Sequence, residues 1–212
     1  MASRLPPGVL RCDDGVERCF WCVGDPLYRS YHDREWGFPV TDDQRLFEKI
    51  ALEGFQAGLS WLTILRKREN FRRAFRGFAP ERVARMGARD VARLLRDPGI
   101  VRHRAKVEAA IHNAKQTLRV IDAHGSLARF VWRFEPSARE RPRRLTRAAV
   151  LKLTETPTSR ALSKELRAAG FRFIGPTTAY AFMQAMGLVN DHLEGCAARE
   201  RALTGRERFR RP

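Results

Sequence analysis

The sequence predicts an all-α protein. Apolar residues recur along most of it at three- and four-residue spacing, which places side chains on one face of a helix. Capping residues precede several of these segments, and glycine ends others. No segment alternates apolar and polar residues convincingly, as a half-exposed strand would. We therefore expect about eight or more helices, without an obvious repeat.

The capping signals set the order of the helices. The first helix begins at the capping-box sequence Thr41-Asp42-Asp43-Gln44, and Ser60 can cap the second. Asp97-Pro98-Gly99 interrupts the chain before a long helix that Gly125 closes. A basic loop covers 136–144. The helices after the first are expected at 60–75, 81–87, 89–96, 107–124, 130–134, 159–169 and 177–186.

The two ends of the chain show no sustained periodicity. We expect a flexible extension over 1–18, a single domain over 19–196 and a frayed basic tail over 197–212. The N-terminus lacks the apolar core of a signal peptide, and no run of about eighteen apolar residues occurs. The expected location is therefore cytoplasmic, with no membrane contact.

The charge of the chain is strongly positive, at +17 for 212 residues. Such a surplus favours a polyanionic partner, and DNA is the commonest one. Lysine supplies six of the 41 basic residues and arginine the rest. A GC-rich genome would also raise the arginine content, so charge alone only favours nucleic acid.

The cysteines indicate a metal site. There are four, too few and too unevenly placed for a disulfide framework in a chain of this length. His192 and Cys196 are four positions apart and share one face of a helical turn. Cys19 with either His32 or Cys22 could complete a zinc site, and local spacing leaves that choice open.

A glycine-bounded turn joins the last two strong helices. Gly170 and Gly175 flank it, and Pro176-Thr177-Thr178 opens the following helix. Free N–H groups and the helix dipole at such a start can bind a phosphate. The turn resembles the helix-hairpin-helix motif of DNA glycosylases, which binds the DNA backbone without reading sequence. The alternative is an ordinary helical connection packed in the core.

Glu53 projects from the apolar face of its predicted helix, seven positions after Leu46 and three after Ile50. A buried carboxylate is costly unless it is paired, so a structural ion pair is one interpretation. The other is recognition of a flat cation between aromatic faces, which attract cationic rings and stack on bases. The aromatic residues around it in sequence are Trp21, Tyr28, Tyr31, Trp36 and Trp61.

Two long segments resemble one family. CFWCVGDPLYRSYHDREWGFPVTDDQRLFEKIALEGFQAGLSWLTILRKRENFR and GFRFIGPTTAYAFMQAMGLVNDHLEGC are similar to the N-terminal half and the C-terminal hairpin region of the 3-methyladenine DNA glycosylase I (Tag) family. The likeness runs from about Cys19 to Cys196. It implies a helix-hairpin-helix enzyme of base-excision repair with one structural zinc that joins the two ends of the domain.

The resemblance also assigns residues. It implies zinc ligation by Cys19, His32, His192 and Cys196, with Cys22 as an additional thiol nearby. It implies a base pocket of Trp21, Tyr28, Tyr31, Glu53 and Trp61, in which Glu53, Tyr28 and Tyr31 serve the reaction. The DNA backbone would lie on Gly170, Gly175, Thr177 and Thr178. The implied partners are alkylated double-stranded DNA and free 3-methyladenine as product, and the implied enzyme is a monomer.

Two positions bear on mechanism. Asn190 stands where many helix-hairpin-helix glycosylases carry a catalytic Asp, and Asp191 is turned away by about 100° on a helix. We therefore expect no strong catalytic carboxylate at the sugar. Since 3-methyladenine in DNA is already a cation, no general acid is needed for it to leave. Thr177 replaces the Lys of bifunctional relatives, which predicts a monofunctional hydrolase.

The main alternative is a zinc-stabilised DNA-binding module without catalysis. It would use the charge, the hairpin and the metal residues equally well. It gives no reason for Glu53 to lie on an apolar face with aromatic residues around it.

Overall fold

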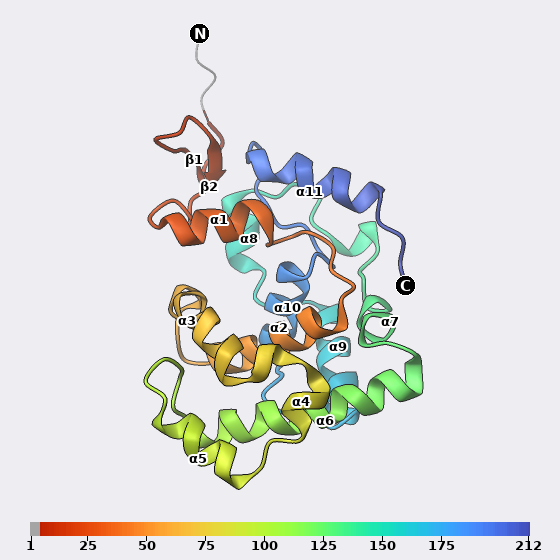
Figure 1. The fold of residues 1–212 in the computed structure, drawn as a ribbon. Helices are drawn as coiled ribbons and strands as arrows, with labels where there is room; N and C mark the ends of the chain where they lie inside the picture. The colour runs from red at the N-terminus through yellow and green to blue at the C-terminus, as the bar shows by residue number, and fades with distance from the viewer. Residues whose placement is uncertain (1–4) are drawn as a thin grey trace.

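Helices dominate the computed structural model, which describes residues 5–212 (Figure 1). The chain belongs to the helical class that the sequence predicts. Two short 3-10 turns lie at Arg76–Phe78 and Ala138–Glu140. The α-helices are α1 (Pro26–Arg34), α2 (Asp43–Gln56), α3 (Trp61–Ala74), α4 (Pro80–Ala84), α5 (Ala88–Arg96), α6 (Arg104–His124), α7 (Leu127–Trp132), α8 (Arg147–Lys152), α9 (Pro157–Ala168), α10 (Pro176–Ala185) and α11 (Ala197–Glu207).

Most predicted helix boundaries have a visible cause. Ser60 caps α3 by accepting a hydrogen bond from the Thr63 N–H, as expected. α2 is capped one residue later than Thr41, by Asp42, whose carboxylate accepts from the Arg45 N–H. Gly125 ends α6 in the left-handed conformation, which glycine adopts without a side-chain clash.

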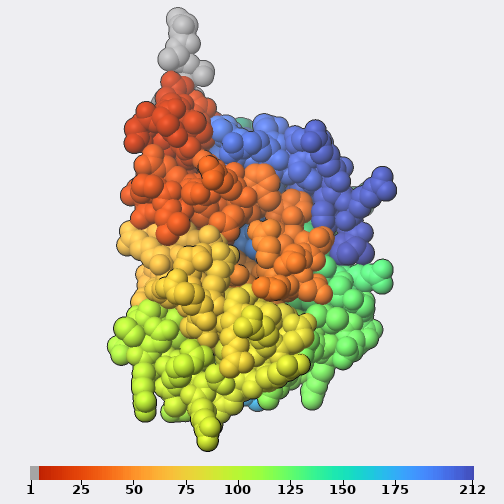
Figure 2. Space-filling model, in the orientation of Figure 1, coloured from red at the N-terminus to blue at the C-terminus, as the bar shows by residue number. Residues whose placement is uncertain are grey.

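Within residues 5–212 both ends of the chain are folded, which corrects the expectation of a flexible extension and a frayed tail, and residues 1–4 of that extension lie outside the described residues. Strands β1 (Val9–Arg11) and β2 (Glu17–Cys19) form an antiparallel hairpin in which Val9 pairs with Cys19. Residues 197–207, expected to be frayed, form α11. Figures 1 and 2 show the hairpin and α11 together at one end of the molecule. Three-residue strands are too short to show a periodicity of two, so the sequence pattern does not reveal them.

Helix α2 passes through the centre of the fold and contacts α3, α6, α7 and α10 (Figure 1). Every residue from Leu46 to Phe55 is buried. The set includes three charged residues, Glu48, Lys49 and Glu53, beside the apolar ones. Because a buried charge is costly without a partner, these three positions call for ion pairs or a functional site.

Helices α9 and α10 form the expected hairpin. Gly170 follows α9 with a φ of +87°, and a Cβ there would meet the Gln116 side chain at 3.0 Å. The turn is held from α6, because the Asn113 side chain donates to the Arg172 carbonyl and accepts from the Arg172 N–H. Gly175 and Pro176 then begin α10. Among residues 5–212, no helix combines the length and the apolar character that crossing a membrane requires.

Candidate base pocket and metal centre

A cavity of about 260 Å³ lies beside α2 and opens between α1, α3, α8 and α10. It brings together all five residues that the sequence proposes for a base pocket. Trp36, which the sequence grouped with them, also lines it. The full lining is Phe20, Trp21, Tyr28, Tyr31, Trp36, Glu53, Gln56, Trp61, Val150, Leu151, Ala181, Gln184, Asp191 and Leu193.

Aromatic rings form much of the wall, since six of the fourteen lining residues carry one. Trp21 packs at an angle against Tyr28, with ring centroids 4.8 Å apart, and edge-on against Trp36 at 5.0 Å. Tyr31 and Trp61 lie 5.4 Å apart on the side of α2. Burial raises the pKa of Tyr28 to about 12, so its hydroxyl keeps its proton at neutral pH. A wall of this kind can enclose a flat heterocycle through stacking and edge contacts.

Glu53 supplies a buried carboxylate to this wall, with 5% of its surface exposed. It is not unpaired. The Lys49 Nζ lies 2.8 Å from Glu53 Oε1, one helical turn earlier on α2. The structural ion pair and the pocket carboxylate, which the sequence treated as alternatives, are therefore both present at Glu53.

Lys49 also contacts two of the aromatic residues. Its Nζ donates to the Tyr31 hydroxyl at 3.0 Å and lies 3.2 Å from the centroid of the Trp61 ring. Burial lowers the pKa of Lys49, and the nearby Glu53 charge opposes that shift. Sequence reasoning missed Lys49. Its signal was its position four residues before Glu53 on a buried helix, where an ion pair forms readily.

Asp191 brings a second carboxylate to the cavity. It is 5% exposed, and its Oδ2 accepts from the Tyr180 hydroxyl at 2.6 Å and from Gln184 Nε2 at 2.9 Å. We expected Asp191 to point elsewhere, by helical rotation from Asn190. Residues 190–193 are not helical, so the argument from a 100° rotation does not apply to them.

Asn190 serves the metal region instead. Its side-chain oxygen lies 2.9 Å from His192 Nδ1, and its amide donates to the Arg199 carbonyl. An Asn at this position therefore holds a histidine ring and the start of α11, rather than facing the cavity. This placement gives a structural reason for the absence of a carboxylate at 190.

A potential metal centre ties the two ends of the chain together. The ligand atoms of Cys19, His32 and Cys196 all lie within 4.8 Å of one another, and all three residues are buried. Hydrogen bonds from the Cys19 thiol and from His32 lower the pKa of Cys196, whereas that of Cys19 is raised. A cysteine that readily becomes a thiolate beside an imidazole is a suitable donor set for a metal ion.

The other two candidates stand just outside this group. The His192 ring is 4.7 Å from the His32 ring, and its Nε2 lies 3.2 Å from the His32 carbonyl oxygen. Cys22 is buried, but its thiol donates to the Cys19 carbonyl at 3.2 Å. The geometry thus favours His32 over Cys22 within the cluster and keeps His192 adjacent to it.

The N-terminal hairpin braces the cluster. His32 Nδ1 lies 2.8 Å from Asp33, which leaves Nε2 facing the Cys196 sulfur at 3.4 Å. Asp33 pairs with the buried Arg18, which in turn pairs with Asp14. Partners of this kind fix the ring orientation of a metal-ligating histidine. Residues before Cys19 therefore take part in the site, contrary to the expectation of a loose extension.

The cavity mouth reaches the helical hairpin. A second, adjoining hollow shares Glu53 with the cavity and includes Thr177 and Thr178 at the start of α10. Leu59, in the turn between α2 and α3, lines the same hollow and is 43% exposed. Lys106 holds this turn by donating to the Phe55 and Ala57 carbonyls. Gly170 instead packs against α6, where its carbonyl meets His112.

A helical hairpin beside an aromatic pocket with a buried carboxylate is typical of proteins that bind the DNA backbone at the hairpin and hold an extruded base in the pocket. The comparisons narrow the class. The Methyladenine glycosylase family model matches residues 21–200, and the chain belongs to that family.

Named relatives agree with the family match. The chain is 51% identical over 183 residues to DNA-3-methyladenine glycosylase 1 of Escherichia coli (strain K12), across 85% of this chain and 96% of the relative. A crystal structure of 3-methyladenine DNA glycosylase I superposes with a TM-score of 0.80 at 50% identity, across 85% and 98% of the two chains. A variant of such an enzyme in complex with 3-methyladenine superposes with a TM-score of 0.78 at 40% identity, across 83% and 94%.

Proposed function

We infer that this protein is a DNA-3-methyladenine glycosylase I, a hydrolase that removes 3-methyladenine from alkylated DNA. The observation that carries this function is the buried Glu53 carboxylate in an aromatic cavity, in a chain of the methyladenine glycosylase family. The relatives described above are named for the same activity. A carboxylate between aromatic faces suits a flat cation.

The pocket binds and orients the damaged base, and the positive charge of the base itself makes it a good leaving group. The damaged nucleotide is turned out of the duplex into the cavity. Trp61 and the neighbouring rings stack on the base, and Glu53 accepts hydrogen bonds from its N6 side. Tyr28 and Tyr31 shape the pocket around it. The N-glycosidic bond breaks to release the base as a neutral molecule, and a water molecule completes hydrolysis at the sugar.

The hairpin holds the DNA. The N–H groups at the start of α10 and the hydroxyls of Thr177 and Thr178 lie at the cavity mouth, where a phosphate next to the extruded nucleotide would pass. Gly175, at the start of α10, lets the turn approach the backbone closely, whereas Gly170, with a φ of +87°, lets the chain turn after α9 against α6. Thr177 has no amine, so the strand is not nicked through a Schiff base.

The metal is a structural zinc. Two thiols and an imidazole are ligand types that zinc prefers, and the cluster of Cys19, His32 and Cys196 fits such a donor set. Cys19, His32, His192 and Cys196 would hold the ion and close its coordination, so that it stabilises the fold without binding water for the reaction.

The protein acts as an intracellular monomer on double-stranded DNA.

A base-release assay tests the function. Methylated duplex DNA is incubated with the protein, and released bases are separated from the DNA. We expect free 3-methyladenine and abasic sites that stay unbroken until alkali is added. Tight DNA binding without base release would instead favour a non-catalytic binding module, and strand breaks without alkali would contradict the monofunctional reaction.

A further inference from the structure

Lys49 makes contacts that the recognition of a cationic base would also use. One ammonium group lies 2.8 Å from the Glu53 carboxylate, 3.0 Å from the Tyr31 hydroxyl and 3.2 Å from the centroid of the Trp61 ring. These three residues all line the cavity, and the function above assigns them to the base. A cation within the protein therefore occupies the groups that a cationic ligand needs.

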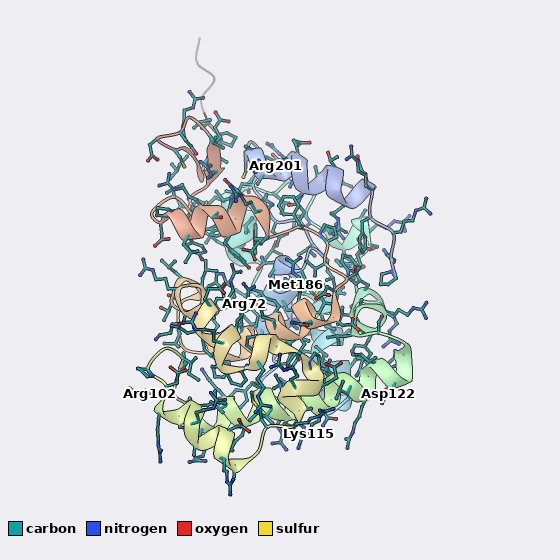
Figure 3. The ribbon with its side chains drawn as sticks, viewed as in Figure 1. Arg72, Arg102, Lys115, Asp122, Met186 and Arg201 are labelled. Carbon is teal, nitrogen blue, oxygen red and sulfur yellow. The ribbon has the colours of Figure 1, made fainter. Side chains whose placement is uncertain are left out.

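Other carboxylates beside Lys49 already have partners. Behind the wall, Glu35 is paired with Arg68 through two hydrogen bonds, and Glu48 is paired with Arg72. Arg72 and Met186, both labelled in Figure 3, line the hollow on this outer side of Lys49. Arg45 lies there too. With two carboxylates taken by arginines, Glu53 is the carboxylate that balances the Lys49 charge.

The electrostatic consequence opposes base binding. A paired Lys49 and Glu53 carry no net charge, so the carboxylate attracts a cationic base less than it would alone. An ammonium on one face of the Trp61 ring also draws on the π-density that would attract a second cation. Burial makes the charged form of Lys49 less favourable, and a second cation placed beside Glu53 would disfavour that form further by repulsion.

We propose that Lys49 is an internal competitor for the cationic base. In the free protein its ammonium occupies Glu53, Tyr31 and Trp61. When a cationic base binds, Lys49 gives its proton to the solvent, and the base takes over the negative charge of Glu53. The charge of the pocket stays balanced, because one cation enters as one proton leaves. This inference rests on the proposed function, since it takes a cationic adenine as the ligand.

Two matched ligands separate the charge effect from general pocket effects. The first is the 3,9-dimethyladenine cation, which is positively charged at neutral pH, and the second is neutral 9-methyladenine. We expect Lys49→Met to bind the cation about ten-fold or more tightly than the wild-type protein does at about pH 8. Affinity for the neutral ligand should change far less. Lys115→Met removes a charge from an exposed position on α6, at the end of the molecule opposite Arg201 of α11 in Figure 3, and should bind both ligands as the wild type does.

Proton release from the unmodified protein provides a test that does not depend on how a variant folds. Calorimetric titration with the cation, in buffers of different ionisation heat, should show about one proton released per ligand wherever Lys49 is charged in the free protein. Lys49→Met and Lys49→Gln should release none; Gln keeps a donor for Glu53 without the charge.

The outcomes are distinguishable. Absence of proton release by the wild type, or equal shifts for both ligands in a folded Lys49 variant, would overturn the competitor role. Weaker binding of the cation by Lys49→Met would show that Lys49 assists recognition instead. Failure of the wild-type protein to release 3-methyladenine from DNA would refute the proposed function itself, whatever Lys49 does.

Discussion

The carboxylates of Glu53 and Asp191 line the same cavity but have different surroundings, which predict different roles in the reaction. Glu53 faces the ammonium of Lys49 and the aromatic wall, so its charge is positioned for a flat cation. Asp191 is held through Oδ2 by two neutral donors, Tyr180 and Gln184, and neither of these contacts is with a cation. The first suits the base, and the second suits positive charge that develops elsewhere in the cavity.

Glu53→Gln should keep the fold and lose much of the excision activity. Gln has nearly the same volume, and its oxygen can still accept from Lys49, but the negative charge that matches the cationic base is lost. A hydrogen bond to a charged group contributes about 1.5–3 kcal/mol, or about ten- to more than a hundred-fold in rate when it is felt in the transition state. Single-turnover release of 3-methyladenine, measured beside thermal unfolding, checks this.

Glu48→Gln is the matched control for that measurement. Glu48 lies on the same helix and is also buried, but it pairs with Arg72 away from the cavity. Its loss should lower stability with little effect on turnover by the folded protein. Normal excision by a stably folded Glu53→Gln protein would mean that Glu53 is not the recognition carboxylate.

Asp191→Asn should slow excision by about ten-fold or more, because a fixed negative charge stabilises the positive deoxyribose that forms as the glycosidic bond breaks. Affinity for the free base should change little, since the substitution keeps the shape of the side chain. The two are measured separately, by single-turnover release and by equilibrium binding. A variant with weakened base binding and an unchanged rate of release would place Asp191 at the base instead of the sugar.

At the scale of elements, the sequence locates the helices with a strong apolar period, whereas it does not reveal α1, α8 or α11. α3 and α6 have many apolar residues at helical spacing and clear capping residues, and both were located. α1 has nine residues, of which only Tyr31 and His32 are buried, and α8 has six with none buried. Too few buried positions remain in such segments to show a period, so packing against the rest of the fold defines them.

The candidate site could likewise be predicted only in part from the sequence. The five pocket residues and the cysteine–histidine cluster carry chemistry that is visible in sequence, and their proximity could be anticipated from the family resemblance. Asp191 could not, because its direction depends on a non-helical turn after α10. Val150 and Leu151 enter the cavity wall from α8, which the sequence did not reveal.

Gly187 ends α10 at a point where the chain crosses the segment before α2. Its φ is +76°, and a Cβ would lie 2.3 Å from the Phe38 carbonyl carbon. Gly187→Ala should therefore destabilise the protein by at least about 2 kcal/mol, because neither the conformation nor the backbone contact tolerates a side chain. Chemical denaturation measures the loss. Gly15→Ala is the control, since its φ is also positive but its Cβ would meet nothing within 4 Å.

At the scale of the whole molecule, the metal cluster joins β2, α1 and the segment before α11, so removal of the ion should loosen the two ends of the chain together. We expect one zinc per chain by elemental analysis and a lower melting temperature after chelation. Cys196→Ala should lose the metal, whereas Cys22→Ala should keep it. Protein purified without chelator but free of zinc would contradict the assignment.

The net charge of +17 predicts how binding to DNA responds to salt. Lysine and arginine that neutralise phosphates release condensed counterions, so affinity should fall linearly with salt on logarithmic axes. A protein with about six or more phosphate contacts loses on the order of a thousand-fold between about 50 and 200 mM salt. Flanking sequence should matter little, because the proposed contacts run from backbone amides and hydroxyls of the hairpin to phosphates. Fluorescence anisotropy with a duplex that carries one stable abasic analogue measures the slope, and binding of the 3,9-dimethyladenine cation over the same range is the control.

The cation has few counterions to release and should bind with a much smaller salt dependence. A DNA affinity that is unchanged between low and physiological salt would show that the arginine surplus reflects genome composition instead of contacts with the phosphate backbone.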